Sequence, residues 1–429
     1  MTTMEDQDPD LDAPISGGDP EFSVDHIRVS LDNVFSPLSP IDRASLFAGR
    51  KEQRRDLQRA ITQKGGHAVL YGERGVGKTS LSNIIIEQYR GTNDTLAVRV
   101  GCDSGDTFSS IWSKVFREIK LISTKRRVGF MAESDKHVRS LSEDLRGEIT
   151  PNDVRVVLES LNANTVCVLD EFDRVGRDQT PLIADVIKMC SDYAVPATII
   201  LVGVAGSVGA LLREHASVER ALTQVPMPRM SSDELREIVI FGFSKVGMTI
   251  DEECLGHITK LSNGLPHYTH LLAQNAGHEA IDCGRTSVMG DDIDKAINRA
   301  VLKSTESIKS AYATATRSPR PEHLYAHVLL ACALAKLDQR GYFLAASVRE
   351  ALAVVKGKRI EIPAFSQHLN DFCDIKRGPI LEKEGPKRSV RFRFINPLMQ
   401  PYVVMSGIAN GLTSRAQLDE FHGDAFAPK

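Results

Sequence analysis

The chain has 429 residues, of which 42% are hydrophobic and 25% charged, a composition typical of a folded protein with two or three domains. Its formal net charge of −3 excludes nucleic-acid binding through overall charge, so any such binding would need a local basic patch. The seven cysteines include no C-x-x-C pair, so we expect neither a disulfide framework nor a zinc site, and we expect a cytoplasmic location.

The first 25 residues carry eight acidic side chains and no lysine or arginine. They lack the apolar stretch of a secretory signal, and no segment approaches the ~18 apolar residues of a membrane-spanning helix. We therefore expect no membrane partner. Together with several proline and glycine residues, the acidic excess predicts that residues 1–36 form a disordered tail.

Residues 37–230 alternate short apolar segments with amphipathic ones, which is typical of an α/β fold whose parallel sheet carries helices on both faces. The predicted strands are nearly continuous apolar runs, as expected for strands covered on both sides. They are His67–Tyr71, Leu96–Val100, Thr165–Leu169 and Ala197–Val204.

Residues 231–317 show only helical patterns, and their first helix begins with a good capping sequence at Ser231. We predict a helical lid here. Its four helices are expected near 233–246, 251–262, 266–283 and 290–315.

Two prolines near residue 320 separate a last domain, predicted over residues 318–408, from a loose tail over 409–429. The domain is expected to contain three helices followed by a β-hairpin. The predicted helices are His323–Leu337, one near Leu344–Val355 and one that begins near Pro363, and the hairpin strands are Pro379–Lys383 and Val390–Ile395.

The segment 72–79 matches the pattern G-x-x-x-x-G-K-[ST], and it follows a predicted strand and opens a predicted helix. Its glycines allow the backbone to wrap closely around phosphate oxygens, to which the loop N–H groups and the helix N-terminus present positive charge. Lys78 is expected to reach the β- and γ-phosphates of ATP, and the Thr79 hydroxyl to bind Mg²⁺. The predicted nucleotide-binding residues are Gly72, Glu73, Arg74, Gly75, Val76, Gly77, Lys78, Thr79 and Ser80.

The predicted strand Thr165–Leu169 ends in the adjacent carboxylates Asp170 and Glu171. We expect Asp170 to hold Mg²⁺ through water and Glu171 to activate the attacking water as a general base. Asp173 follows closely and is interpreted either as a helix cap or surface residue, or as part of the site.

These motifs, with a further strand implied between the two of them, resemble the AAA+ and STAND branches of the P-loop ATPases, and in particular the origin-recognition-type AAA+ initiators. The resemblance covers residues 40–300 and implies a three-layer sandwich with a parallel sheet and a helical lid. Residues 46–52 resemble a family box that packs by the adenine, which assigns Gly49 and Arg50 to the nucleotide pocket. Gly264–Pro266 resembles the G-x-P lid motif, whose proline, here Pro266, packs on the nucleotide.

The resemblance also marks departures. His267 stands where initiators carry a lid arginine, and a neutral histidine cannot reproduce that fixed charge. The polar sensor at the end of the fourth strand falls on Gly206, with Ser207 beside it as the candidate. An arginine finger is supplied by a neighbouring subunit in these families, which implies a homo-oligomer. Arg220 is the first candidate and Arg213 the second, and a surface ion pair is the alternative for both.

The order of elements in the last domain resembles a winged helix. Seven basic residues lie in its hairpin region, and three of them, Lys387, Arg388 and Arg391, are our candidates for contact with double-stranded DNA. Winged helices also bind proteins, so two hypotheses stay open. In the first, a DNA-acting ATPase uses ATP to control assembly or DNA engagement; in the second, a STAND-like switch binds a protein partner through this domain.

Overall fold

The computed structural model describes residues 20–90, 95–125, 135–141, 147–204, 218–318, 324–338, 340–386 and 389–421. A five-stranded parallel sheet with the order β2-β5-β6-β1-β7 forms the centre of the first half, which confirms the predicted α/β class. Its strands are β1 (His67–Gly72), β2 (Thr95–Gly101), β5 (Asn164–Asp170), β6 (Ala197–Val204) and β7 (Leu222–Met227).

Four of these strands agree with the prediction, whereas β7 was not predicted. It lies at the edge of the sheet, pairs only with β1, and alternates buried and accessible residues. Pro226 within it is tolerated because an edge strand does not need every N–H group for pairing. An apolar run, the signal for a strand covered on both faces, is therefore absent here.

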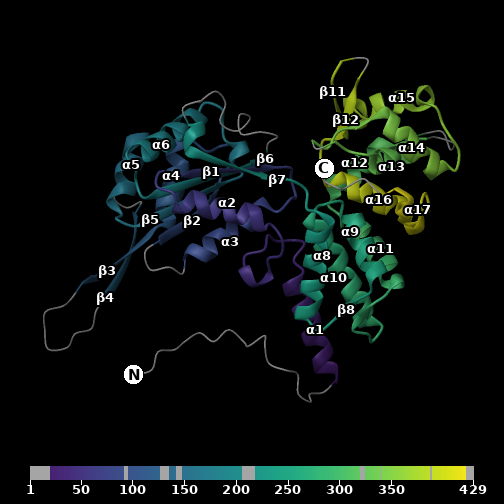
Figure 1. Ribbon diagram of the computed structural model, residues 1–429, viewed down its shortest axis with the longest axis horizontal. Coiled ribbons are helices and arrows are strands. Elements are labelled where there is room, and N and C mark those ends of the chain that lie inside the picture. The colour runs from purple at the N-terminus through teal and green to yellow at the C-terminus, as the bar shows by residue number, and fades with distance from the viewer. Residues whose placement is uncertain are drawn as a thin grey trace.

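Helices cover both faces of the sheet (Figure 1). Side chains alternate along each strand, so that Ala68 and Leu70 join one hydrophobic core while Val69 joins the other. The first core includes α2 (Lys51–Thr62) and α3 (Lys78–Arg90). The second core includes α4 (Phe108–Glu118), α5 (Pro151–Ser160) and α6 (Thr180–Asp192).

An antiparallel ribbon of β3 (Lys120–Lys125) and β4 (Asp135–Ser140) projects away from the sheet (Figure 1). It connects α4 to α5 along the chain. No prediction placed strands here.

The helical lid consists of five helices rather than four. They are α8 (Ser232–Lys245), α9 (Glu252–Ser262), α10 (Pro266–Asp282), α11 (Gly290–Lys303) and α12 (Glu306–Thr316), and the short strands β8 (Thr249–Ile250) and β9 (Ser287–Val288) pair between them. The prediction of one helix over 290–315 was wrong, because Ser304 and Thr305 adopt ψ angles of 151° and 145° and interrupt it.

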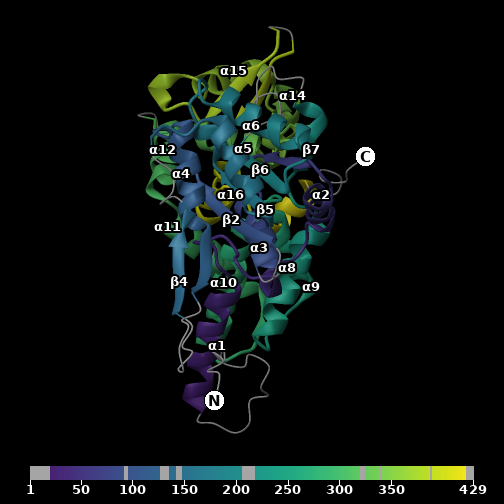
Figure 2. The same ribbon diagram turned by 90° about the vertical axis from the view of Figure 1, so that its left-hand side faces the viewer.

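The predicted disordered tail 1–36 needs a correction, because α1 (Pro20–Val34) forms a helix that runs along the lid (Figures 1 and 2). Leu31 and Phe35 are fully buried, and Val24 and Ile27 pack on the same core. The aromatic ring of Phe35 lies 5.0 Å from that of Phe243 in α8. The prediction rested on the acidic residues and overlooked apolar residues at helical spacing, which pack against the lid.

The last domain follows the predicted order of helices and hairpin, with one further short strand. Its elements are α13 (Tyr325–Leu334), β10 (Phe343–Leu344), α14 (Ala345–Lys356), α15 (Ile362–Asp371), β11 (Leu381–Glu384) and β12 (Arg391–Phe394). The three strands pair antiparallel in the order β10-β12-β11, and Phe392 and Phe394 face the buried Phe343.

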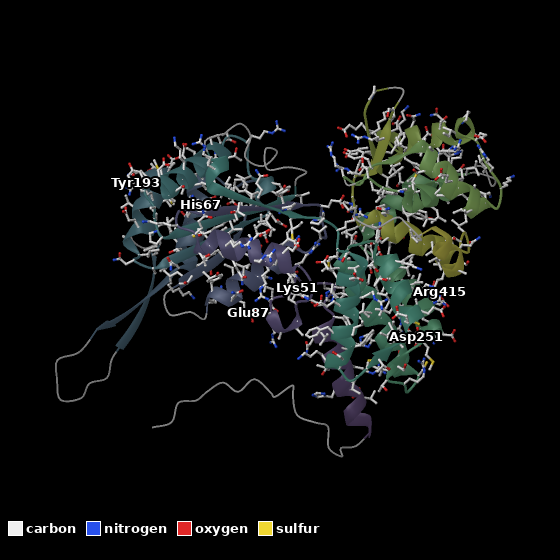
Figure 3. All side chains as sticks on the ribbon, viewed as in Figure 1. Lys51, His67, Glu87, Tyr193, Asp251 and Arg415 are labelled. Carbon is white, nitrogen blue, oxygen red and sulfur yellow. The ribbon has the colours of Figure 1, made fainter. Side chains whose placement is uncertain are left out.

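Two more helices follow the hairpin, α16 (Met399–Ala409) and α17 (Arg415–Phe421). The predicted loose tail 409–429 is therefore wrong over α17. Leu418 is buried there, and Arg415 forms an ion pair of 2.9 Å with Asp294 of the lid; Figure 3 labels this arginine beside the lid helices. Within the described residues, no helix has the length and apolarity needed to cross a bilayer.

His67 provides a test of the core. Its ring is fully buried at the start of β1, where Nδ1 accepts a hydrogen bond of 2.9 Å from the backbone N–H of Ile199 (Figure 3). Burial lowers the pKa of His67 to about 4, against 6.5 for an ordinary histidine. The unfolded chain therefore binds a proton at a higher pH than the folded chain does, and stability is lost as the pH falls from about 6.5 towards 4.

We expect the free energy of unfolding to fall by about 2 kcal/mol between pH 7 and pH 5 through His67 alone. Urea titrations at the two pH values measure this. The variant His67→Asn keeps an acceptor and should lose that share of the pH dependence. The control His26→Asn changes an exposed residue and should keep it; equal pH dependence in both variants would contradict the assignment.

Candidate functional site

The loop between β1 and α3 has the conformation that its glycines allow. Gly75 and Gly77 adopt φ angles of +86° and +93°, which residues with a side chain rarely take. A side-chain carbon at Gly75 would also lie 2.9 Å from Leu398 Cδ2. The loop wraps around the N-terminus of α3, where backbone N–H groups have no partner within the helix and can bind an anion.

Lys78 is held by the loop itself. Its Nζ donates hydrogen bonds to the carbonyl oxygens of Gly72 at 3.0 Å and Glu73 at 2.7 Å. Burial lowers the pKa of Lys78 to about 8, and the nearby carboxylates of Asp173 and Asp170 oppose this effect. A bound phosphate would add negative charge and raise this pKa again, so the lysine is placed where an anion is favourable.

A cavity of about 760 Å³ opens at this loop, which is within the range of small-molecule sites. Its walls come from the segment 36–50, the phosphate loop, the ends of β5 and β6, and the lid. The predicted site residues that line it are Arg50, Arg74, Gly75, Val76, Gly77, Lys78, Thr79, Ser80, Asp170, Glu171 and Pro266. The predicted residues outside its lining are Gly49, Gly72, Glu73 and Arg220.

The two carboxylates at the end of β5 differ in surroundings. Asp170 is buried, and its Oδ2 accepts a hydrogen bond of 2.8 Å from Arg99 on the neighbouring strand β2. Glu171 adopts φ = +54°, unusual for a residue other than glycine, and its exposed carboxylate pairs with Arg174 at 2.7 Å. Both residues face the same cavity as Lys78, but both carry an arginine partner.

Asp173 was interpreted from the sequence either as a cap or surface residue or as part of the site, and the structure has features of both. It lines the cavity, and its Oδ1 accepts a hydrogen bond of 2.8 Å from the backbone N–H of Val204. Val204 is the last residue of β6. Asp173 thus fixes the strand end from which the sensor residue is expected.

The residues present fit a magnesium ion bound together with phosphates. Thr79 and Asp170 offer the oxygen atoms that Mg²⁺ prefers, and both line the cavity. No group of three or more His, Cys, Asp or Glu side chains suited to a metal occurs among the described residues. Magnesium bound with a nucleotide takes one or two carboxylates from the protein, and substrate phosphates and water supply its other ligands.

Arg50 is buried and joins three parts of the chain. Its Nη2 donates to the carbonyl oxygens of Val76 in the phosphate loop, at 3.0 Å, and of Pro228 before the lid, at 2.6 Å. Its backbone N–H donates to Glu234 of α8 at 2.9 Å. Burial lowers the pKa of Arg50 and Glu234 opposes this. Gly49 beside it packs tightly against the lid, since a side-chain carbon there would lie 2.7 Å from Met230 Cε.

The lid reaches the cavity with the first turn of α10. Pro266 is at the start of this helix, near Gly77. His267 Nδ1 lies 2.9 Å from the carbonyl oxygen of Pro37, which can only accept, so the proton is on Nδ1. Burial lowers the pKa of His267, which keeps this ring neutral. The segment after α1 therefore closes against the lid at the cavity.

Several predicted residues lie elsewhere. Arg220 is exposed in a short 3₁₀ turn (Glu219–Ala221) and stays a predicted arginine finger. Four candidates fall outside the described residues: Ser207, Arg213, Lys387 and Arg388.

Sequence reasoning missed three contributors: Arg99, Arg229 and the segment 36–41. Arg99 is the one charged residue in β2, and that isolated charge in an apolar strand was an available signal. Arg229, which contacts Glu73 of the loop, follows β7 in the link to the lid. Neither it nor the segment 36–41 carries a recognisable motif, since their roles depend on contacts with distant parts of the chain.

Comparison with known proteins agrees with this geometry. Residues 61–211 match the family described as an AAA domain, which confirms the predicted AAA+ type of P-loop fold for this part of the chain. No match was found among curated proteins.

Similar solved structures include Cdc6p of Pyrobaculum aerophilum, with 17% identity over 89% of this chain and 99% of that one and a TM-score of 0.45. The Walker-type ATPase of Pyrococcus abyssi has 18% identity over 86% and 99%, with a TM-score of 0.47. The ORC2 protein of Aeropyrum pernix has 16% identity over 88% and 98%, with a TM-score of 0.47. At these values the likeness says nothing about what this chain binds.

We expect Arg50→Ala to lower the free energy of unfolding by about 2–4 kcal/mol, because a buried carbonyl oxygen at Val76 and a partly buried one at Pro228 lose a charged donor. Urea unfolding measures the loss. Arg55→Ala removes an exposed arginine of helix α2, which begins directly after Arg50, and should cost less than about 0.5 kcal/mol. If both variants unfold at the same urea concentration, Arg50 does not hold these parts together.

Proposed function

We propose that this chain binds ATP with Mg²⁺ in the cavity, hydrolyses it, and uses its nucleotide state to control assembly or DNA engagement. One observation carries the proposal: the loop that holds Lys78 and the strand end that carries Asp170 and Glu171 line one cavity within an AAA domain. Lys78 offers positive charge to the phosphates at the N-terminus of α3, and the two carboxylates offer negative charge to a magnesium ion.

Each side chain has a definite task in this proposal. Lys78 neutralises charge on the β- and γ-phosphates, and Thr79 with Asp170 holds the magnesium ion, which offsets phosphate charge during transfer. Glu171 accepts the proton of the attacking water. For that it has to leave Arg174, and since the pair is half exposed, separating it costs little.

Hydrolysis would be completed by a second copy of the chain. Arg220 lies on the surface outside the cavity, as a residue that acts on a neighbouring subunit requires. In this proposal it supplies positive charge to the γ-phosphate of the next subunit in a homo-oligomer.

Two substitutions separate binding from turnover. Lys78→Ala should abolish ATP binding, because the phosphates lose their main positive partner, whereas Glu171→Gln should keep binding and lower turnover by about 10²–10⁴-fold. Calorimetry measures binding and phosphate release measures turnover.

The controls change exposed residues of the same kind, Lys188→Ala and Glu118→Gln, and should behave like the unmodified chain. Unchanged turnover in Glu171→Gln would refute its role as the base. Intact ATP binding in Lys78→Ala would refute the site.

We further propose that the last domain is a winged helix that contacts double-stranded DNA through its hairpin. The order of its elements and the basic residues of the region support this. Lys376 is exposed in a 3₁₀ turn (Ile375–Arg377) that follows α15, and Lys383 lies on β11.

A second function, a switch whose last domain binds a protein, is favoured by two observations. Several basic residues are already paired, since Arg391 contacts Asp338 and Glu384 while Arg393 contacts Glu382. Ile375 beside Lys376 is 85% exposed, an apolar group suited to a protein partner.

Binding to duplex DNA at several salt concentrations distinguishes the two functions. Replacing Lys387, Arg388 and Arg391 by alanine should weaken DNA binding and reduce the slope of log K against log salt by about 2–3, one for each phosphate that is no longer neutralised. A control variant replaces three exposed lysines elsewhere: Lys51, Lys245 and Lys295. If the unmodified chain binds no DNA, the protein-binding function is favoured; if the triple variant binds as well as the control, the hairpin does not bind the DNA.

A further inference from the structure

Arg229, in the link between β7 and α8, contacts three separate parts of the chain. Its Nε donates to Glu73 Oε2 of the phosphate loop at 2.9 Å. Its Nη1 donates to the carbonyl oxygen of Asn263, between α9 and α10, at 3.3 Å and to Gln400 Oε1 of α16 at 3.0 Å. The side chain is 16% exposed, so these contacts are largely shielded from water.

The C-terminal region reaches the phosphate loop at further points. Leu398, just before α16, packs closely on Gly75: a side-chain carbon at Gly75 would lie 2.9 Å from Leu398 Cδ2, so that Leu398 would have to shift. The Tyr268 hydroxyl of α10 donates to the Leu398 carbonyl oxygen at 2.7 Å. Figure 1 shows α16 between the lid and the remaining C-terminal elements.

Gln400 anchors this contact on its other side. Its Nε2 donates to the carbonyl oxygen of Ala333 at the end of α13, at 2.9 Å, and the side chain is buried. A buried amide satisfied on both sides has one favourable orientation, and displacing it leaves polar groups without partners. The path from Glu73 to α13 is thus a chain of direct hydrogen bonds.

Glu73 connects this path to the lysine of the phosphate loop. Its carboxylate is bound by Arg229, and its own carbonyl oxygen accepts the hydrogen bond from Lys78 Nζ. Because Arg229 fixes the side chain of Glu73, the peptide group of Glu73 is restricted as well. Its carbonyl oxygen orients Lys78. An ordered loop loses less conformational entropy when a ligand binds.

We propose that Arg229 is a positioning residue that couples nucleotide binding at the loop to docking of residues 396–409. Each event stabilises the other, because a coupling free energy between two sites acts equally in both directions. The inference rests on the nucleotide binding proposed above. It adds that the C-terminal region is a structural part of that site.

The first test measures the affinity for Mg-ADP by calorimetry. Arg229→Ala should weaken binding about tenfold, since a shielded charge-assisted hydrogen bond to the loop is removed. Glu73→Gln keeps the shape of the loop and should weaken binding less. Arg236→Ala is the control, because Arg236 forms an ion pair of 2.7 Å with Glu252 on the lid, away from the loop.

The second test measures hydrogen exchange of the backbone amides in α16 with and without Mg-ADP. In the unmodified chain and in Arg236→Ala, nucleotide should slow this exchange at least several-fold. In Arg229→Ala the protection should disappear, although the helix itself is intact. Leu398→Ala, which loosens the contact from the other side, should weaken Mg-ADP binding in the same direction and provides the test if Arg229→Ala does not fold.

The outcomes separate the two proposals. If the unmodified chain does not bind Mg-ADP, the proposed function fails. If it binds, but α16 exchanges equally with and without nucleotide, or Arg229→Ala and Leu398→Ala bind as tightly as Arg236→Ala, the coupling is refuted while nucleotide binding stands.

Discussion

The site depends on one arrangement, a buried ammonium group held by the carbonyl oxygens of its own loop. Lys78 has lost much of its water, and the loop supplies two acceptors at close range. That geometry exists only if the peptide groups of 72–77 keep their directions. Positive φ angles give the loop its path, Arg50 holds it at Val76, and Arg229 holds it at Glu73. Arg229 belongs to the link between β7 and α8 that leads into the lid, and Arg50 binds the same link at Pro228.

Both carboxylates at the end of β5 are paired with an arginine in this structure, and in the proposed function these pairs have to open. Arg99 pairs with Oδ2 of Asp170, the residue that would hold the metal ion, and Arg174 pairs with Glu171. A cation with two charges competes well for Asp170, whereas Glu171 is exposed and its pair is weak. Metal and nucleotide would therefore redistribute charges that the chain balances internally without them.

Local patterns allowed prediction of the phosphate loop, four strands of the sheet and most lid helices, because each depends on residues close in sequence. Edge strand β7 gave no such pattern, and the acidic residues around α1 masked its apolar stripe. The resemblance assigned Arg50 to the nucleotide pocket. The side-chain hydrogen bonds of Arg50 and Arg229 could not be derived, because the acceptors lie between 26 and 178 residues away along the chain. Long-range pairing of single polar groups leaves no periodicity in a sequence.

The two hydrophobic cores extend over different parts of the chain. The core behind α4, α5 and α6 stays within the α/β half, whereas the other runs from β1 and α3 through the lid to α13 and α16 without interruption. Proteins open in roughly contiguous cooperative units, and segments with many shared buried apolar contacts belong to the more stable of these. We therefore expect the C-terminal elements and the phosphate-loop face to unfold together, so that removing residues beyond the lid would uncover apolar surface rather than release an independently folding α/β half. On this expectation, the boundary between the two cooperative units follows the sheet rather than the domain boundaries predicted from the sequence.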